Sequence, residues 1–285
     1  MQKITVTAID GKTISATVHN LDDSGAKGIV VICHGFGEHG AMYVEVAETL
    51  GQAGYACVLF DQRGHGAPPG TEAAAGGRTK YFGVTPGYGS FLDDVLSVTA
   101  AARQIAPGLP IALYGHSMGG NIVINTLLSG SGGYACAILE APWIGLYKEH
   151  SPLITGFARV AGKISPRLTT MNKLKPELLT SEPERMKNYL DDPLYHGRIS
   201  FRMFTGISDG CSYAVKNAAK LPVPVFLAYA ENDKVLSSDA TLRFAAAAGE
   251  LAEVRGYGSR HAIHNDSARA EFFHDVIKFL DGHCR

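Results

Sequence analysis

The chain has 285 residues, of which 46% are hydrophobic and 19% charged, with 26 basic against 27 acidic side chains. A formal net charge of −1 gives no electrostatic reason to expect nucleic acid or an anionic membrane as the main partner. Ordinary apolar content without charge runs excludes intrinsic disorder and supplies enough apolar side chains for a sizeable core.

The chain begins with two segments in which apolar and polar residues alternate, Ile4–Ile9 and Thr13–His19, separated by Asp10-Gly11. Alternation with period two around an Asp-Gly pair predicts a β-hairpin. The same alternation argues against a secretory signal peptide, because such a peptide needs a continuous apolar segment.

Beyond the hairpin, short continuous apolar runs alternate with segments of helical periodicity. The runs are typical of strands covered on both faces. They are Gly28–Cys33, Tyr55–Phe60, Pro110–Tyr114, Ala135–Leu139 and Val223–Tyr229. The helical segments are Met42–Leu50, Ser90–Ile105, Asn121–Leu128 and a final apolar helix face from Phe272 to Leu280. This order predicts an α/β fold with a parallel sheet covered by helices.

One long region, between Pro142 and Pro222, breaks the alternation because it contains no clear strand. We interpret residues 143–221 as a helical insertion over a core formed by residues 1–142 and 222–285, although ordinary core helices would give the same periodicity. Within the insertion, one helical stripe is apolar: Leu153, Ile154, Phe157, Val160, Ala161 and Ile164.

The five cysteines are odd in number and widely spaced: Cys33, Cys57, Cys136, Cys211 and Cys284. This pattern predicts buried free thiols in a reducing compartment, so we expect a cytoplasmic protein. No set of cysteines, histidines and carboxylates has the spacing of a zinc site, and we expect no metal and no cofactor.

The strongest chemical signal is Gly115-x-Ser117-x-Gly119, which follows an apolar run and precedes a helical segment. A serine in a sharp strand-to-helix turn has a strained backbone, and its neighbours two positions away must lack side chains to avoid collision. The motif therefore predicts Ser117 as a nucleophile. The alternative is a glycine-rich turn with an idle serine.

A serine nucleophile needs a base that takes its proton and an acid that orients the base, in the chain order serine, acid, histidine. The loop after the last strand-like run offers His261 and His264 as bases, and we favour His261 because it lies nearer the strand end. The loop after Val223–Tyr229 offers Glu231 and Asp233 as acids, and spacing favours Asp233.

Hydrolysis of an acyl group also needs hydrogen-bond donors for the oxyanion that forms on the carbonyl oxygen. In this arrangement one donor is the backbone amide after the nucleophile, here Met118. The second comes from the loop after an earlier strand, here His34–His39, in which the amide of Phe36 lies between two glycines.

Five short motifs, spread over most of the chain, occur in a fixed order. They are His34–His39 followed by Tyr43, Asp61–Gly66, Gly115–Gly120, Asp192–Gly197 and His261–Asp266. Together they resemble serine α/β-hydrolases of the monoacylglycerol lipase and lysophospholipase type. The resemblance implies an α/β-hydrolase fold with a mostly parallel eight-stranded sheet, and a lid formed by residues 143–221. It also implies Ser117, Asp233 and His261 as the triad, with the Phe36 and Met118 amides as oxyanion donors.

The sequence departs from this family just after Gly66, where a long segment rich in proline, glycine and alanine follows. Loops longer than about 15 residues are usually functional or disordered. We expect Ala67–Gly89 at the rim of the site, where it would influence the preferred acyl chain and head group.

We therefore predict a carboxylic ester hydrolase that works through an acyl-enzyme on a small ester or monoacyl lipid. Trp143, Ile154 and Phe157 are expected to bind the acyl chain, and the insertion is expected to touch lipid surfaces transiently. A peptidase or amidase is the alternative, since Glu177, Glu182 and Glu184 could hold a substrate amine. A non-catalytic binding module would normally lack one member of the triad.

Overall fold

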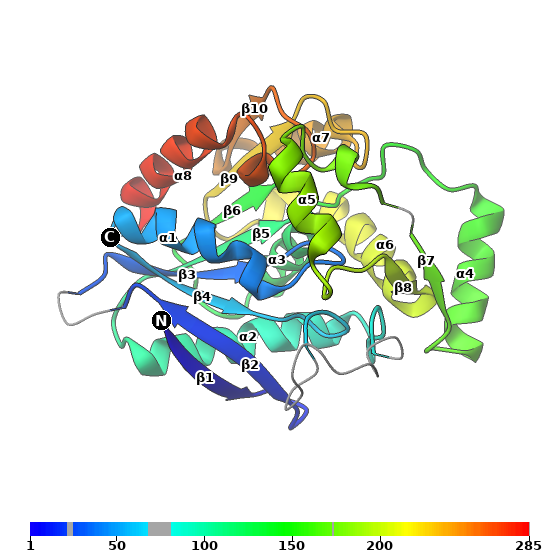
Figure 1. The fold of residues 1–285 in the computed structure, drawn as a ribbon, viewed down its shortest axis with the longest axis horizontal. Coiled ribbons are helices and arrows are strands. Elements are labelled where there is room, and N and C mark those ends of the chain that lie inside the picture. The colour runs from blue at the N-terminus through cyan, green and yellow to red at the C-terminus, as the bar shows by residue number, and fades with distance from the viewer. Residues whose placement is uncertain (22–24, 68–80, 173, 285) are drawn as a thin grey trace.

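The computed structural model describes residues 1–21, 25–67, 81–172 and 174–284. Its main sheet has eight strands in the order β1-β2-β4-β3-β5-β6-β9-β10 (Figure 1). The strands are β1 Gln2–Thr7, β2 Thr13–His19, β3 Gly28–Cys33, β4 Tyr55–Phe60, β5 Ile111–His116, β6 Cys136–Glu140, β9 Val225–Ala230 and β10 Ala252–Tyr257. Strand β2 is antiparallel to β1 and β4, and all other neighbours are parallel. The predicted fold class is confirmed.

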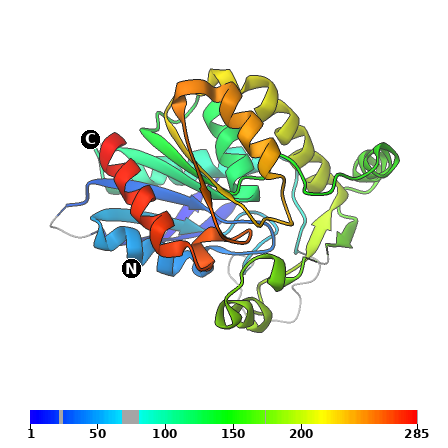
Figure 2. The ribbon, with the colours of Figure 1, turned by 90° about the horizontal axis from the view of Figure 1, so that it is seen from above.

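Helices cover both faces of this sheet, as Figure 2 shows. On one face lie α1 (Val44–Gln52) and α8 (Arg269–His283). On the other lie α2 (Gly89–Ile105), α3 (Met118–Leu128) and α7 (Ser238–Ala248). Every residue of β3, β4, β5 and β6 is consequently buried, which explains their continuous apolar sequences. Short 3₁₀ helices lie at Gly40–Tyr43, Pro176–Leu178, Ala218–Lys220, Gly249–Leu251 and Ile263–Asn265.

The region between β6 and β9 has two parts. Its last helix, α6 (Phe201–Asn217), packs on α3, and Met203, Ile207 and Ala214 belong to the core. The part before α6 contains α4 (Pro152–Ile164), β7 (Thr169–Met171), α5 (Pro183–Asp191) and β8 (Arg198–Ser200). Strands β7 and β8 form a small antiparallel sheet that the sequence pattern did not indicate. Helix α4 lies at the margin of the molecule, away from the main sheet (Figure 1).

Two other predictions concern the loop after β4 and the cysteines. The predicted loop Ala67–Gly89 falls largely on residues 68–80, which lie outside the described residues, and α2 begins at Gly89. In the described part of the chain the five cysteines are free, and four of them are buried. Among the described helices, none combines the length and the apolar character needed to cross a bilayer.

Candidate active site

The residues predicted to carry the chemistry lie at the carboxyl ends of neighbouring strands. Ser117 follows β5, Asp233 follows β9 and His261 follows β10, while Phe36 follows β3. In a parallel sheet these ends meet at one edge, where ligands usually bind. Ser117, His261 and Phe36 line one small cavity there. The structure thus brings together residues that are far apart in the sequence.

The turn at Ser117 has the strained geometry that the Gly-x-Ser-x-Gly spacing predicts. Ser117 has φ 53° and ψ −115°, which an L-residue rarely adopts. A Cβ atom on Gly119 would lie 2.0 Å from the Cys33 carbonyl oxygen, and one on Gly115 would lie 2.5 Å from the Gly119 oxygen. Both positions therefore require glycine, because the strand–turn–helix backbone passes too closely for any side chain.

His261 and Asp233 form a buried hydrogen-bonded pair. The Nδ1 atom of His261 donates to Oδ2 of Asp233 at 2.7 Å. The other oxygen, Oδ1, accepts from the amides of Val235 at 2.7 Å and Leu236 at 2.9 Å, which fixes the carboxylate. This geometry leaves Nε2 as the nitrogen of His261 that can act as a base.

The pKa shifts of the pair follow from burial and from their mutual attraction. Burial raises the pKa of Asp233. The charge of His261 and the hydrogen bonds to the carboxylate together lower this pKa by more than burial raises it, so the net shift is downward. Burial lowers the pKa of His261, but the charge of Asp233, its hydrogen bond and the charges of Glu38 and Glu140 together outweigh burial, and the pKa rises above its ordinary value. Both shifts favour an ionised carboxylate beside the imidazole.

The structure also separates the alternatives that spacing left open. Glu231, the other acid, has an exposed side chain. His264, the other base, is engaged by a different carboxylate, because its Nδ1 lies 2.9 Å from both oxygens of Glu140. Of the two histidine–carboxylate pairs, His261 with Asp233 is therefore the one whose histidine lines the cavity of Ser117.

The loop that carries Phe36 is held by another of the motifs, Asp192–Gly197. His39 bonds through Nε2 to Oδ2 of Asp192 at 2.8 Å, and the His196 amide donates to the Gly37 carbonyl at 2.9 Å. Met118 opens α3, so its amide is among the first-turn groups that have no acceptor within the helix. The Asp192–Gly197 motif thus supports the loop in which an oxyanion donor is expected.

Two adjoining cavities meet at this edge. The small one, about 40 Å³, contains Ser117 and His261, and it shares Trp143, Leu146 and Val235 with a cavity of about 910 Å³. The larger cavity is mainly apolar, and Ile154, Phe157 and Phe204 contribute to its wall. Its size is in the usual range for small-molecule sites. All three residues predicted to bind an acyl chain, Trp143, Ile154 and Phe157, line it.

Sequence reasoning missed a group of buried polar residues near Ser117 and His261. Glu38 and Glu140 are both buried carboxylates, and His116 precedes the nucleophile. One signal was available, because a glutamate that closes an apolar strand is rarely buried without a partner. Its partner could not be read from the sequence, since His264 lies more than one hundred residues further along.

The fold and this arrangement define the protein as an α/β-hydrolase. Residues 24–268 match the family model described as serine aminopeptidase, S33 (Hydrolase_4), and the chain belongs to this family.

Relatives within the family share most of the chain. The monoacylglycerol lipase of Mycolicibacterium smegmatis is 26% identical over 92% of this chain and 90% of its own length. The crystal structure of the Paleococcus ferrophilus monoacylglycerol lipase has a TM-score of 0.82, at 26% identity over 95% of this chain and 99% of that one. A Saccharomyces cerevisiae monoglyceride lipase, at 23% identity over 100% of this chain and 95% of that one, shares the fold with a TM-score of 0.85. The predicted resemblance is confirmed: the chain is an α/β-hydrolase of the monoglyceride lipase type, in the esterase and lipase class.

Proposed function

We propose that the protein hydrolyses carboxylic esters through an acyl-enzyme formed on Ser117. His261 takes the hydroxyl proton while Ser117 Oγ attacks the ester carbonyl, and the amides of Phe36 and Met118 bind the resulting oxyanion. The proton then passes from His261 to the leaving alcohol as the carbonyl–oxygen bond breaks. A water molecule repeats the sequence to release the acid, and Asp233 orients the imidazole throughout.

The observation that carries this proposal is the juxtaposition of a strained serine with a buried histidine–carboxylate pair. Ser117 and His261 line one cavity, and His261 donates to Asp233 at 2.7 Å. A serine hydroxyl is a weak nucleophile unless such a base lies beside it, so the strain at Ser117 supports a catalytic role.

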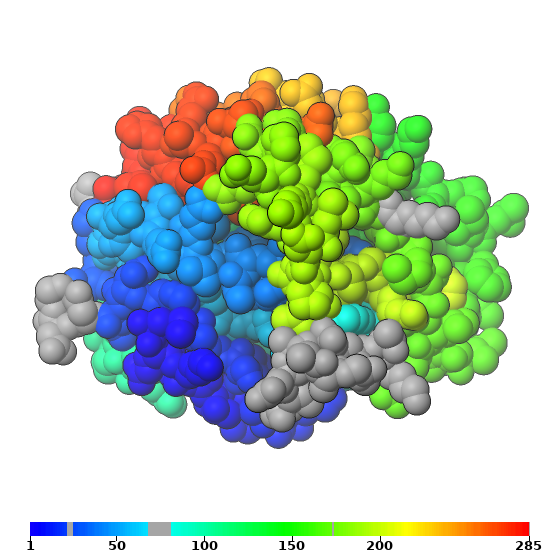
Figure 3. Space-filling view, in the orientation of Figure 1, coloured from blue at the N-terminus to red at the C-terminus, as the bar shows by residue number. Residues whose placement is uncertain are grey.

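The substrate class follows from the larger cavity. Its apolar wall suits an acyl chain: Trp143 lines both cavities, and Ile154 and Phe157 line the larger one. The relatives named as monoacylglycerol lipases support a monoacyl lipid as the substrate. We propose that residues 143–221 form the lid of this site. Figure 3 shows the yellow-green residues of this segment across the face in view and the green residues of α4 at its right edge.

Helix α4 offers a surface for transient contact with lipid. Leu153 is 86% exposed and Ile164 is 80% exposed, and both lie outside the wall of the acyl cavity. Apolar side chains on an exposed helix face are favoured at a lipid–water interface.

A location in the cytoplasm, which is a reducing compartment, fits the free thiols of the five cysteines.

Replacing both Leu153 and Ile164 by serine is expected to weaken binding to phosphatidylcholine vesicles by at least about tenfold, because each side chain loses apolar burial in the interface. Hydrolysis of a soluble short-chain ester should be unchanged, since neither residue lines the cavities. Vesicle co-sedimentation measures the expected loss of vesicle binding. Leu242→Ser, another exposed leucine, serves as the matched control, and equal vesicle binding by the double variant would contradict the proposal.

An aminopeptidase is the second candidate, because the family is described by that activity. An aminopeptidase needs an acidic group for the substrate amine, but Glu177, Glu182 and Glu184 are exposed and do not line the cavity of Ser117. Glu38 does line it, but its carboxylate already accepts from the Gly35 amide and from the hydroxyls of Tyr43 and Tyr189. The side chains around Ser117 therefore favour an ester.

A substrate panel tests the choice between ester and peptide. We expect kcat/KM to rise from acetyl to long-chain monoacylglycerols, with no measurable hydrolysis of aminoacyl anilides. Hydrolysis of the anilides in preference to the esters would contradict the proposed function.

A further inference from the structure

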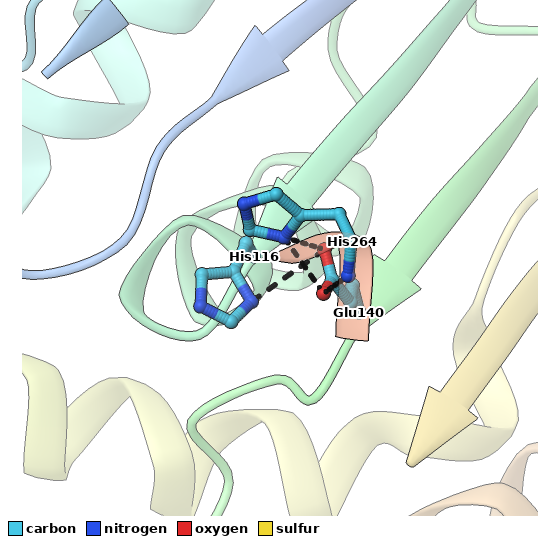
Figure 4. Close-up of side chains that lie close together, drawn as sticks. All are labelled: His116, Glu140 and His264. Atoms are coloured by element: carbon cyan, nitrogen blue, oxygen red, sulfur yellow. Dashed lines mark hydrogen bonds and ion pairs between the residues drawn. The ribbon is translucent and has the colours of Figure 1, made fainter. Parts of the chain in front are cut away.

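A second histidine–carboxylate pair, His264 with Glu140, lies beside His116 (Figure 4). The Nδ1 atom of His264 is 2.9 Å from both carboxylate oxygens of Glu140. Both side chains are buried, and neither lines the cavity that contains Ser117. The mechanism proposed above gives this pair no role.

Glu140 joins three segments that meet at the active site. Its carbonyl oxygen accepts from the amide of Ser117 at 3.0 Å, and its carboxylate accepts from the amide of His264 at 2.9 Å. The hydroxyl of Tyr114, in the strand that leads to Ser117, also donates to the carboxylate. A single residue therefore contacts both the turn of the nucleophile and the loop that carries His261.

The charges in this buried region support a stable ion pair. Burial alone raises the pKa of Glu140, but the charges of His264 and His116 with the hydrogen bonds lower the pKa to about 2. Burial lowers the pKa of His264, but the charge and the hydrogen bond of Glu140, with the charge of Glu38, together outweigh burial and raise it. Removing one partner of such a pair is costly, because the other charge stays buried without compensation.

His116 lies between the two pairs. Its ring centroid is 4.8 Å from that of His261 and 5.2 Å from that of His264, and its Nδ1 lies 3.6 Å from Oε2 of Glu140. Burial lowers the pKa of His116 to about 4, so it packs as a neutral ring. Movement of His264 would therefore be transmitted to His261 both through the loop and through this ring.

The atoms of His116, Glu140 and His264 that could bind a metal all lie within 4.8 Å of one another. Both carboxylate oxygens of Glu140 already accept hydrogen bonds from His264, and one of them also accepts from Tyr114. An ion would have to displace these donors in a fully buried cluster, so the contacts favour a hydrogen-bonded pair over a metal site.

We propose that Glu140 is a positioning residue for ester hydrolysis: through His264, its carboxylate fixes the loop of His261 to the strand end beside Ser117. The proposal rests on the roles given to Ser117 and His261 in the proposed function. Misplacement of a base by about 1 Å can cost about 10²-fold in rate, which sets the size of the expected effect.

The test compares Glu140→Gln, His264→Leu and His264→Asn on a soluble short-chain ester. We expect Glu140→Gln and His264→Leu each to lower kcat by about 10²-fold with KM unchanged, because binding groups stay in place. The double variant, Glu140→Gln with His264→Leu, should be no slower than either single variant, since both substitutions break the same contact. His264→Asn should retain most of kcat, because its amide nitrogen can donate from nearly the position of Nδ1.

The controls separate positioning from stability. Glu253→Gln, at an exposed glutamate of β10, should leave kcat unchanged. A folded Glu140→Gln or His264→Leu with wild-type kcat would overturn the proposal, even if it unfolds at a lower temperature. If Glu140→Gln does not fold, the kcat values of His264→Leu and His264→Asn test the proposal, which equal values would overturn. Ester hydrolysis that survives Ser117→Ala would instead contradict the proposed function itself.

Discussion

Replacement of Ser117 by alanine is expected to lower kcat for ester hydrolysis by about 10⁶-fold, with KM almost unchanged. Ser117 provides the attacking oxygen, and the base and the acid have nothing to activate when it is removed. The fold should be preserved, since alanine is smaller than serine and the turn geometry is set by the glycines on either side. Initial rates on a short-chain p-nitrophenyl ester, with circular dichroism as a check on folding, measure this effect.

Ser131→Ala is the matched control because Ser131 is exposed in the loop before β6. This variant should hydrolyse the ester at the wild-type rate. Wild-type activity in Ser117→Ala would mean that another group attacks the carbonyl, and the proposed mechanism would then be wrong.

The second large effect is expected for Asp233→Asn, which should lower kcat by about 10⁴-fold. The asparagine oxygen can still accept from the Val235 and Leu236 amides, so its NH₂ group is directed at Nδ1 of His261. His261 would then carry its proton on Nε2 and could not accept one from Ser117. Glu231→Gln, at the exposed alternative acid, should leave kcat unchanged, and a loss confined to that variant would reverse the assignment.

The pH dependence of kcat/KM reports on the same pair. His261 must be neutral to accept a proton, so the rate falls as the pH drops through its pKa. Because Asp233, with smaller contributions from Glu38 and Glu140, raises the pKa of His261, the acidic limb should lie above the ordinary value of about 6.5. In Asp233→Asn the limb should move to lower pH, although Glu38 and Glu140 remain. An unchanged limb would contradict the assignment of Asp233.

Local sequence patterns were sufficient to predict much of the fold. The hairpin is present as β1 and β2, although β1 ends at Thr7 rather than at Ile9. The apolar runs are the central strands because burial on both faces requires apolar side chains at every position. The nucleophile turn is equally local, since its glycines avoid clashes with backbone only a few residues away or in the neighbouring strand.

Features that depend on distant partners could not be predicted in the same way. Strands β7 and β8 have three residues each, too few for a periodic pattern, and they pair across α5. Glu140 and His264 are also far apart, and their pairing depends on the order of strands in the sheet. Periodicity does not show which surface a helix covers, so the packing of α6 on α3 could not be predicted either.

The most direct test of the central claim is to map the residue that a fluorophosphonate modifies. Such a reagent reacts only with a serine activated by a neighbouring base. Mass spectrometry of the digested protein should find the phosphonyl group on the peptide that contains Ser117, and Ser117→Ala should not be labelled. A folded wild-type protein that is not labelled, or that carries the group on a different serine, would contradict the account.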